Sequence, residues 1–324
     1  MKIIITGGLG FIGTNLVEFL LSSSHEVLCL DKNSYASNYK YHQILSDKNS
    51  YYDIEILDLS SSTTLDSIIH NFQPDLVFHL AAESHVDRSI DSPKDFIQSN
   101  IIGTYNLLEA IRKYNHSSVK LIHVSTDEVF GSHEDHKFTE ITRYDPSSPY
   151  SASKAAADHL VRAWSRTFNI NINITNCSNN FGPFQHNEKL IPKVIQCLQE
   201  RKEIPIYGTG ENIRDWLFVQ DHVFALYEIA TNGVKNESYN IGSSNELSNI
   251  SITHYICSIY DQLVGTQNSK DLISFVKDRP GHDFRYSIDA SKLIHDTAWR
   301  PKSSFETALS QTVEWYLQNP TYLK

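Results

Sequence analysis

Two side chains spaced for proton transfer stand out in the sequence. Tyr150 and Lys154 are four residues apart, so on a helix they project from one face, one turn apart. A tyrosine with its ordinary pKa of about 10 is a poor base at neutral pH. A neighbouring ammonium stabilises the phenolate and lowers that pKa. The pair predicts removal of a hydroxyl proton as hydride leaves the same carbon. The alternative is a solvated helix start.

Two adjacent acids, Asp127 and Glu128, follow Thr126 directly after the apolar run 120–125. That run reads as a buried strand, and ligands bind outside the carboxyl ends of strands in open α/β sheets. Neighbouring carboxyls in different surroundings can hold different pKa values, so that one stays protonated as an acid and the other is ionised as a base. The alternative is a loop in which Asp127 caps a turn and Glu128 is solvated.

The glycine-rich segment 7–13 lies between an apolar strand pattern, 2–6, and an apolar helical pattern. Glycines there allow a tight turn and a close approach of the backbone to a pyrophosphate, which the helix N-terminus attracts. Asp31 ends the second strand pattern, where a carboxylate accepts hydrogen bonds from the adenosine ribose. NAD is therefore favoured over NADP, although Lys32 could tolerate a 2′-phosphate. The alternative is a structural turn that binds no ligand.

The elements that must position these residues alternate between short apolar runs and helical patterns. The strand patterns are 2–6, 26–31, 52–57, 75–80, 120–125 and 171–176. This alternation is typical of βαβ units, so we expect an α/β fold with a doubly wound parallel Rossmann sheet. After about residue 180 the rhythm changes, which predicts a smaller α/β C-terminal substrate lobe. We expect a cofactor domain at 1–180 and a nucleotide-sugar lobe at 181–324, with an approximate boundary and a chain that crosses between the lobes.

Composition narrows the class of protein. The 324 residues include 28 Lys and Arg against 38 Asp and Glu, a formal net charge of −10 that argues against binding to nucleic acids or anionic membranes. No apolar run approaches the roughly 20 residues of a membrane helix, and no signal peptide is visible. The four cysteines lie far apart and form no metal-binding or disulfide pattern. We therefore expect a cytoplasmic protein without a metal.

Together these residues resemble the extended short-chain dehydrogenase/reductase family, and within it the nucleotide-diphosphoglucose 4,6-dehydratases of the dTDP-glucose type. The resemblance runs over nearly the whole chain and rests on the segments 7–13, 80–89, 125–131, 150–154, 178–183, 188–192, 214–216 and 278–282. The Thr126-Asp127-Glu128 triplet discriminates, because sugar 4-epimerases of the same superfamily share the glycine turn and the Tyr/Lys pair but usually lack adjacent acids there.

The resemblance implies a lyase reaction that converts an NDP-glucose into an NDP-4-keto-6-deoxyglucose. Tyr150 would take the C4 hydroxyl proton as hydride passes to NAD, with Thr126 on the same oxygen and Lys154 holding Tyr150 and the nicotinamide ribose. Glu128 would remove the C5 proton, and a protonated Asp127 would assist loss of the C6 hydroxyl as water. The hydride would then return to C6 and a proton to C5.

The resemblance also implies binding residues at matching positions. The cofactor residues would be Gly7, Gly10, Phe11, Ile12, Gly13, Asp31, Lys32, Asn33, Ser34, Asp58, Leu59, Leu80, Ala81, Ala82, Ser84, Ser99, Tyr150, Lys154 and Asn180. The substrate residues would be Ser84, Thr126, Asn179, Glu188, Lys189, Leu190, Ile191, Pro192, Lys193, Pro205, Ile206, Tyr207, Arg214, Asn249, Asp278, Arg279 and His282. Arg214 and Arg279 would meet the diphosphate, with surface ion pairs as the alternative. Asp58 could equally cap a helix.

Several alternatives stay open. UDP-glucose dehydratases share these motifs, a nucleotide-sugar 4-epimerase is the runner-up activity, and a non-catalytic NAD-binding sensor is a third possibility. The helix that begins at Tyr150 has an expected apolar face of Ala152, Ala156, Leu160, Trp164 and Phe168. By resemblance, the helices 96–113 and 150–168 would pair with their symmetry mates in a homodimer.

Overall fold

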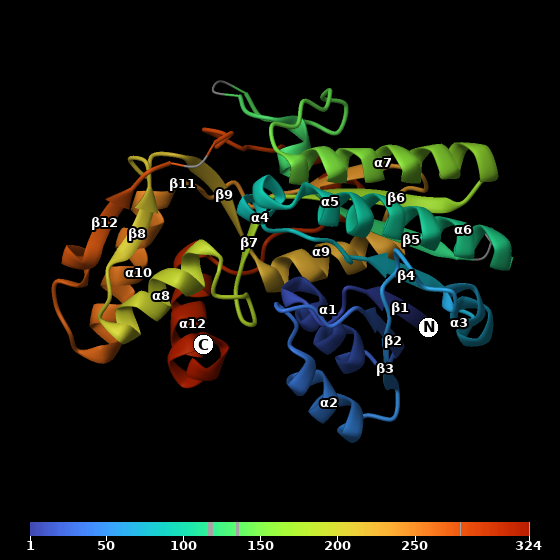
Figure 1. Cartoon of the computed structure of the whole chain (residues 1–324), viewed down its shortest axis with the longest axis horizontal. Coiled ribbons are helices and arrows are strands. Elements are labelled where there is room, and N and C mark those ends of the chain that lie inside the picture. The colour runs from blue at the N-terminus through green and yellow to red at the C-terminus, as the bar shows by residue number, and fades with distance from the viewer. Residues whose placement is uncertain (116–118, 134–135, 279, 324) are drawn as a thin grey trace.

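A seven-stranded parallel sheet forms the centre of the computed structural model, which describes residues 1–115, 119–133, 136–278 and 280–323 (Figure 1). Its strand order is β10-β6-β5-β4-β1-β2-β3, and every neighbouring pair is parallel. The strands are β1 (Lys2–Thr6), β2 (Glu26–Asp31), β3 (Tyr52–Ile56), β4 (Leu76–His79), β5 (Lys120–Thr126), β6 (Asn171–Cys177) and β10 (Ser238–Ile241). The expected α/β doubly wound Rossmann architecture is confirmed.

Helices cover both faces of this sheet, as its apolar strands require. One face packs against α1 (Phe11–Ser22), α2 (Tyr39–Lys48) and α9 (Val219–Asn232). The other face packs against α3 (Leu65–Phe72), α6 (Gly103–Asn115) and α7 (Pro149–Phe168). Among the described helices, none is both long and apolar enough to cross a bilayer.

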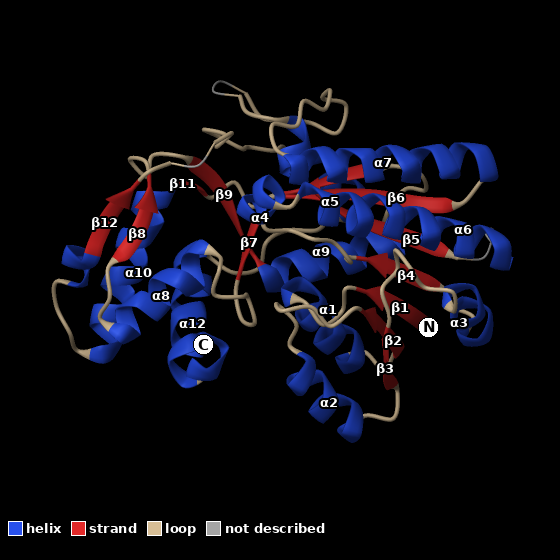
Figure 2. Cartoon of the chain, in the orientation of Figure 1, coloured by secondary structure: helices blue, strands red, loops and turns tan. Residues whose placement is uncertain are grey.

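The smaller lobe carries two short sheets and a group of helices (Figure 2). One sheet holds β7 (Asn179–Phe181), β9 (Ile213–Phe218) and β11 (Glu246–Ser248), and the other holds β8 (Ile204–Tyr207) and β12 (Ile273–Val276). The helices are α8 (Leu190–Glu200), α10 (Asn249–Val264), α11 (Ser291–Thr297) and α12 (Phe305–Gln318), with short 3-10 turns η3 (Ser269–Leu272) and η4 (Pro320–Leu323).

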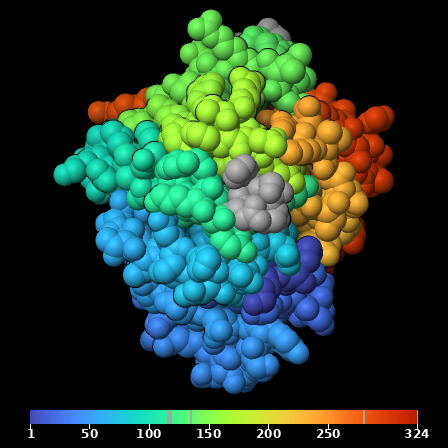
Figure 3. All heavy atoms as spheres, turned by 90° about the vertical axis from the view of Figure 1, so that its right-hand side faces the viewer, coloured from blue at the N-terminus to red at the C-terminus, as the bar shows by residue number. Residues whose placement is uncertain are grey.

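The chain crosses back to the large sheet after entering the smaller lobe. Strand β10 pairs with β6, and Lys120 Nζ donates to the carbonyls of Ile229 and Ala230 at the end of α9, at 2.8 and 2.9 Å. In Figure 3 the orange segment of this crossing abuts the yellow-green residues of the first half. A division at residues 180/181 stays our proposal, with α9 and β10 contributing to the first body.

A continuous helical path leads from α4 (Val86–Asp91) and α5 (Pro93–Phe96) through a π-helical turn, η1 (Ile97–Ile102), into α6. It packs beside α7, the helix that carries Tyr150. The expected apolar face of α7 is wrong as a description of its buried side, because Ala152 is exposed and Leu160, Trp164 and Phe168 are only partly buried. Polar side chains lie on the buried side instead, including Ser151, Ser153, Lys154, Asp158 and Ser165.

Candidate active site

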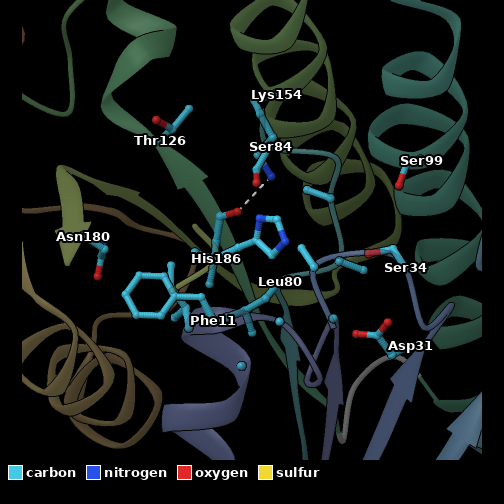
Figure 4. A pocket seen from close by; sticks show the side chains of 18 of the residues that line it. Phe11, Asp31, Ser34, Leu80, Ser84, Ser99, Thr126, Lys154, Asn180 and His186 are labelled. Carbon is cyan, nitrogen blue, oxygen red and sulfur yellow. Dashed lines mark hydrogen bonds between the residues drawn. The ribbon is translucent and has the colours of Figure 1, made fainter. Parts of the chain in front are cut away.

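A cavity of about 300 Å³ opens at the carboxyl edge of the large sheet, beside the point where the strand order reverses between β1 and β4. Figure 4 shows Phe11 and Asp31 on one side of it and Thr126 and Lys154 on the other. The five proposed catalytic residues all line this cavity. So do all proposed cofactor residues except Asn33, and so do five of the proposed substrate residues: Ser84, Thr126, Asn179, Glu188 and Lys189.

The glycine turn is shaped by close backbone packing. Gly7 has φ +71°, and a Cβ placed there would lie 2.6 Å from the backbone nitrogen of Ala81. A Cβ on Gly13 would lie 2.6 Å from Gly8 Cα. Side chains are therefore excluded, and the first turn of α1 begins directly at the cavity with its N–H groups free of intrahelical partners. This arrangement suits the phosphates of a dinucleotide.

Asp31 is held in place at the end of β2. Its Oδ2 accepts from the Leu9 backbone N–H at 3.1 Å, and its Oδ1 accepts from the Asn33 N–H at 2.8 Å. Each carboxylate oxygen keeps a second lone pair for a ribose hydroxyl. Lys32, the residue that could have met a 2′-phosphate, forms an ion pair with Glu83. These contacts favour a cofactor without that phosphate.

The two adjacent acids sit in a short 3-10 turn, η2 (Asp127–Phe130), at the end of β5. Thr126 caps this turn by accepting from the Glu128 N–H at 3.3 Å. Asp127 is 2% exposed, and its Oδ2 has no hydrogen-bond partner among the residues that the structure describes. Burial raises the pKa of Asp127 well above its ordinary value, and the charges of Glu128 and Asp215 act in the same direction. Burial therefore favours the protonated form of Asp127.

Tyr150 and Lys154 enter the cavity from the first turns of α7. Ser148 and Pro149 start this helix: Ser148 Oγ accepts from the Ser151 N–H at 3.1 Å, and Ser151 Oγ accepts from the Ser148 N–H at 3.0 Å. This reciprocal capping satisfies two backbone donors. It holds the Tyr150 side chain against the end of β5.

The expected lowering of the Tyr150 pKa by Lys154 is wrong for the protein alone. Burial raises the pKa of Tyr150 well above its ordinary value, and the charge of Glu128 raises it further, while a hydrogen bond with Thr126 opposes them. The Lys154 ammonium donates to the Val124 carbonyl oxygen at 2.9 Å. In the protein alone, desolvation and the charge of Glu128 therefore favour the neutral phenol of Tyr150.

Buried oxygens without partners mark where a ligand fits. Ser37 Oγ, Ser178 Oγ and Asn179 Oδ1 join Asp127 Oδ2 in this group among the described residues that line the cavity. Buried polar atoms are normally hydrogen-bonded. Beside them, Asn180 Oδ1 accepts a hydrogen bond from His222 Nδ1 at 2.8 Å, which fixes the amide orientation. The donor set and the glycine turn together fit the expected NAD.

Glu188, which lines the cavity, is the centre of a group of contacts that we call the Glu188 clasp. Tyr35 donates its hydroxyl hydrogen to Glu188 at 3.0 Å, and the Arg88 guanidinium lies 3.5 Å from the centre of the Tyr35 ring. His85 Nε2 lies 3.7 Å from Glu188. Three segments that are distant in sequence therefore meet at one carboxylate.

Other proposed substrate residues lie outside this cavity: Leu190, Ile191, Pro192, Lys193, Pro205, Ile206, Tyr207, Arg214, Asn249, Asp278 and His282. The side chains of Ile191 and Ile206 belong to the hydrophobic core. The Arg214 guanidinium is buried and donates to the carbonyls of Asp283 and Phe284 at 2.9 and 3.2 Å, rather than pointing into the cavity. Arg279 lies outside the described residues.

Some cavity residues escaped the sequence analysis. His186 and Gln185 line the cavity, as do Ala36, Ser37, Val124, Ser125, Cys177 and Ser178. His186 precedes the Glu188 clasp in a loop without regular spacing, so no periodic pattern marks it. Ser99 was predicted by resemblance, and the structure places it in the π-helical turn η1, a feature frequently found at functional sites. Asp58 lines the cavity and also accepts from the Ser60 N–H at 2.8 Å.

Comparisons with known proteins agree with this geometry. The family model described as GDP-mannose 4,6 dehydratase matches residues 4–312. A dTDP-glucose 4,6-dehydratase of Escherichia coli is 48% identical, over 98% of this chain and 94% of its own length. The crystal structure of DesIV, a dTDP-glucose 4,6-dehydratase from Streptomyces venezuelae with NAD bound, has TM-score 0.92 and 36% identity, with full coverage of both chains. A UDP-glucose 4-epimerase from Thermotoga maritima has TM-score 0.88 and 25% identity, covering 99% of this chain and all of its own.

The buried acid predicts a pH-dependent cost to stability. Because the folded state holds the pKa of Asp127 above that of the unfolded chain, stability is fully present at low pH and is lost as pH rises through the folded value. We expect Asp127→Asn to gain stability relative to the natural protein as pH rises above about 4, the ordinary pKa of an aspartate, in chemical unfolding. The exposed control Asp53→Asn should show no such trend. A margin that stays constant with pH would contradict the buried-acid assignment.

Proposed function

The chain belongs to the GDP-mannose 4,6-dehydratase family of extended short-chain dehydrogenases, and we propose that it removes water from dTDP-glucose to give dTDP-4-keto-6-deoxyglucose. The observation that carries this proposal is the pair of adjacent acids beside the Tyr/Lys pair in one cavity. The 48% identity to dTDP-glucose 4,6-dehydratases supports dTDP over UDP as the nucleotide.

The first part of the reaction needs a base at the C4 hydroxyl. NAD, when bound, supplies the acceptor and later the donor of hydride. Tyr150 takes the hydroxyl proton, and Thr126 hydrogen-bonds the C4 oxygen of the sugar. Lys154 holds the Tyr150 side chain as it becomes a phenolate. The hydrogen bond of Thr126 with Tyr150 supports this arrangement. The Lys32–Glu83 ion pair supports NAD over NADP, because it engages the cation nearest Asp31.

The second part needs an acid and a base on neighbouring carbons. A ketone at C4 acidifies the C5 hydrogen, and Glu128 removes it as a proton. Asp127, which burial keeps protonated, gives its proton to the C6 hydroxyl so that water leaves. Asp127 is buried, whereas Glu128 is partly exposed. This difference in environment separates the role of acid from the role of base. The adjacent acids therefore favour dehydration over 4-epimerisation, the activity of the Thermotoga maritima neighbour.

The direct test is turnover of purified protein with dTDP-glucose and with UDP-glucose. A 4-keto sugar, detected by its absorbance in alkali, should form from dTDP-glucose at the higher kcat/KM. Formation of a 4-epimer without a keto product would favour the epimerase instead. Absence of any turnover with both sugars would leave only the NAD-binding sensor of the same fold.

Two variants separate the two halves of the reaction. Glu128→Gln should still oxidise C4, but it should lose water about 10²–10⁴-fold more slowly. Reduced cofactor should therefore accumulate, which is measured by the near-ultraviolet absorbance of the reduced nicotinamide. Tyr150→Phe should not accumulate reduced cofactor, because it lacks the base for the C4 hydroxyl. Full turnover by Glu128→Gln would refute the assigned C5 base. Cofactor reduction at the natural rate in Tyr150→Phe would show that another residue takes the first proton.

We further propose that the protein works as a cytoplasmic homodimer. The four cysteine side chains are buried thiols that form no disulfide, which suits a reducing compartment. Partly exposed apolar side chains on α7, together with Ile97 and Tyr105 on the adjoining η1 and α6, support a second copy packing on this face. Ile97 is 49% exposed and Tyr105 is 42% exposed.

The dimer proposal predicts a change of mass on mutation. We expect light scattering at micromolar concentration to give twice the 37.0 kDa chain mass, and Ile97→Asp to shift the population toward the monomer because it buries a charge in the interface. Ile141→Asp, at a site 95% exposed, is the matched control and should leave the dimer intact. A monomeric natural protein would contradict the proposal.

A further inference from the structure

A stripe of four functional groups runs along one face of α7. Tyr150, Lys154, Asp158 and Arg162 follow one another at intervals of four residues, the spacing that brings side chains together on a helix. Tyr150 and Lys154 belong to the cavity, and Asp158 lies one turn beyond them, fully buried. Neither the glycine turn nor the acid pair accounts for this buried carboxylate.

Asp158 is surrounded by hydrogen-bond donors. Ser125 Oγ donates to its Oδ2 at 2.9 Å, as does the Tyr144 hydroxyl at 2.9 Å, and His123 Nε2 lies 3.1 Å from its Oδ1. Arg162 Nη2 donates in turn to the Tyr144 hydroxyl at 3.0 Å. A carboxylate without water is costly unless it is hydrogen-bonded and paired with charge. The three hydrogen bonds meet the first condition, and the charge of Lys154, one turn earlier on α7, acts on the same carboxylate, so the pKa of Asp158 is lowered and the carboxylate is ionised at neutral pH.

Most of the titratable groups around the Lys154 ammonium are neutral at pH 7. Burial lowers the pKa of both His79 and His123, on β4 and β5, so these imidazoles are neutral at pH 7. Burial raises the pKa of the Cys177 thiol on β6 to about 12, so it is neutral as well. Among the described groups that interact with this ammonium, Asp158 is therefore the one that carries negative charge at neutral pH.

We propose that Asp158 is a positioning residue that keeps Lys154 protonated inside the cavity, and that the network of His123, Ser125 and Tyr144 holds it in place for that purpose. The inference rests on the proposed function only in giving Lys154 a role beside Tyr150. The electrostatic pairing itself stands on the helix spacing, the burial of both groups and the three donors.

The directions of the two pKa values agree with this pairing. Burial holds the pKa of Lys154 below its ordinary value, and the charge of Asp158 opposes that effect. Burial also opposes ionisation of Asp158, but the hydrogen bond of His123 and the charge of Lys154 outweigh it and lower the pKa of Asp158. Removing the carboxylate charge must therefore lower the pKa of Lys154 further. A required ammonium would then be lost at a lower pH.

The test follows the protonation of Lys154 in the ligand-free protein. Lysine labelled with ¹⁵N at Nζ gives an NMR signal that reports protonation, and Lys154→Met assigns the signal by its disappearance. In Asp158→Asn we expect the titration midpoint of Lys154 to fall by ~1 pH unit or more, as for loss of a nearby opposite charge. We expect the alkaline limb of the kcat/KM profile with dTDP-glucose to move in the same direction.

Controls separate charge from structure. Asp158→Glu keeps the charge and should restore the midpoint toward that of the natural protein, even if kcat falls. Asp66→Asn removes one exposed carboxylate on α3 and should change neither the midpoint nor the limb. If Asp158→Asn does not fold, Asp158→Ser removes the same charge in a smaller side chain.

The proposal would be overturned if Asp158→Asn or Asp158→Ser folds and the titration midpoint of Lys154 is unchanged. The NMR titration needs no substrate, so it decides the role of Asp158 even if dTDP-glucose is not turned over. Failure of turnover with a shifted midpoint would count against the proposed function alone.

Discussion

Removal of water from around ionisable side chains is the constraint on which this site depends. Asp127, Tyr150 and Lys154 are each less than a tenth exposed, and each has its pKa moved by burial toward the neutral form. In water these groups would be an ionised acid, a neutral phenol and an ammonium of ordinary strength. Burial thus favours the protonated form of Asp127, which can donate a proton, and the neutral phenol form of Tyr150.

The fold creates this environment by bringing strand ends and one helix start together. Strand β5 ends in the 3-10 turn that carries both acids, and α7 begins beside it with a capped first turn. The glycine turn after β1 reaches the same edge of the sheet from the other side of the switch point. The proposed reacting groups are thus held on regular elements, whereas the contacts at Glu188 come from loops and a short helix.

The two lobes are connected by more than a single linker. The chain leaves the large sheet after β6, forms β7 and α8, and returns through α9 to add β10. His222, on the returning helix, holds Asn180 at the cavity, and Gln220 donates to Asn15 on α1 at 2.8 Å. The returning helix α9 is therefore anchored close to the cofactor side. The relative position of the two lobes depends on these buried contacts as well as on chain connectivity.

The sequence alone determined the elements and the list of reacting groups, because periodicity and short motifs are local properties. The six N-terminal strands, the glycine turn, Asp31 and the five proposed catalytic residues could all be identified from neighbouring residues along the chain. Only the tertiary structure decided the protonation states of these side chains. Desolvation depends on burial, and the segments that bury a side chain are far apart in sequence. The raised pKa of Tyr150, the inward-facing carbonyl partners of the Arg214 guanidinium and the buried polar side of α7 all came from such packing. Asp158 shows the same limit: its spacing was visible in the sequence, but its three hydrogen-bond donors come from β5 and from the loop before α7.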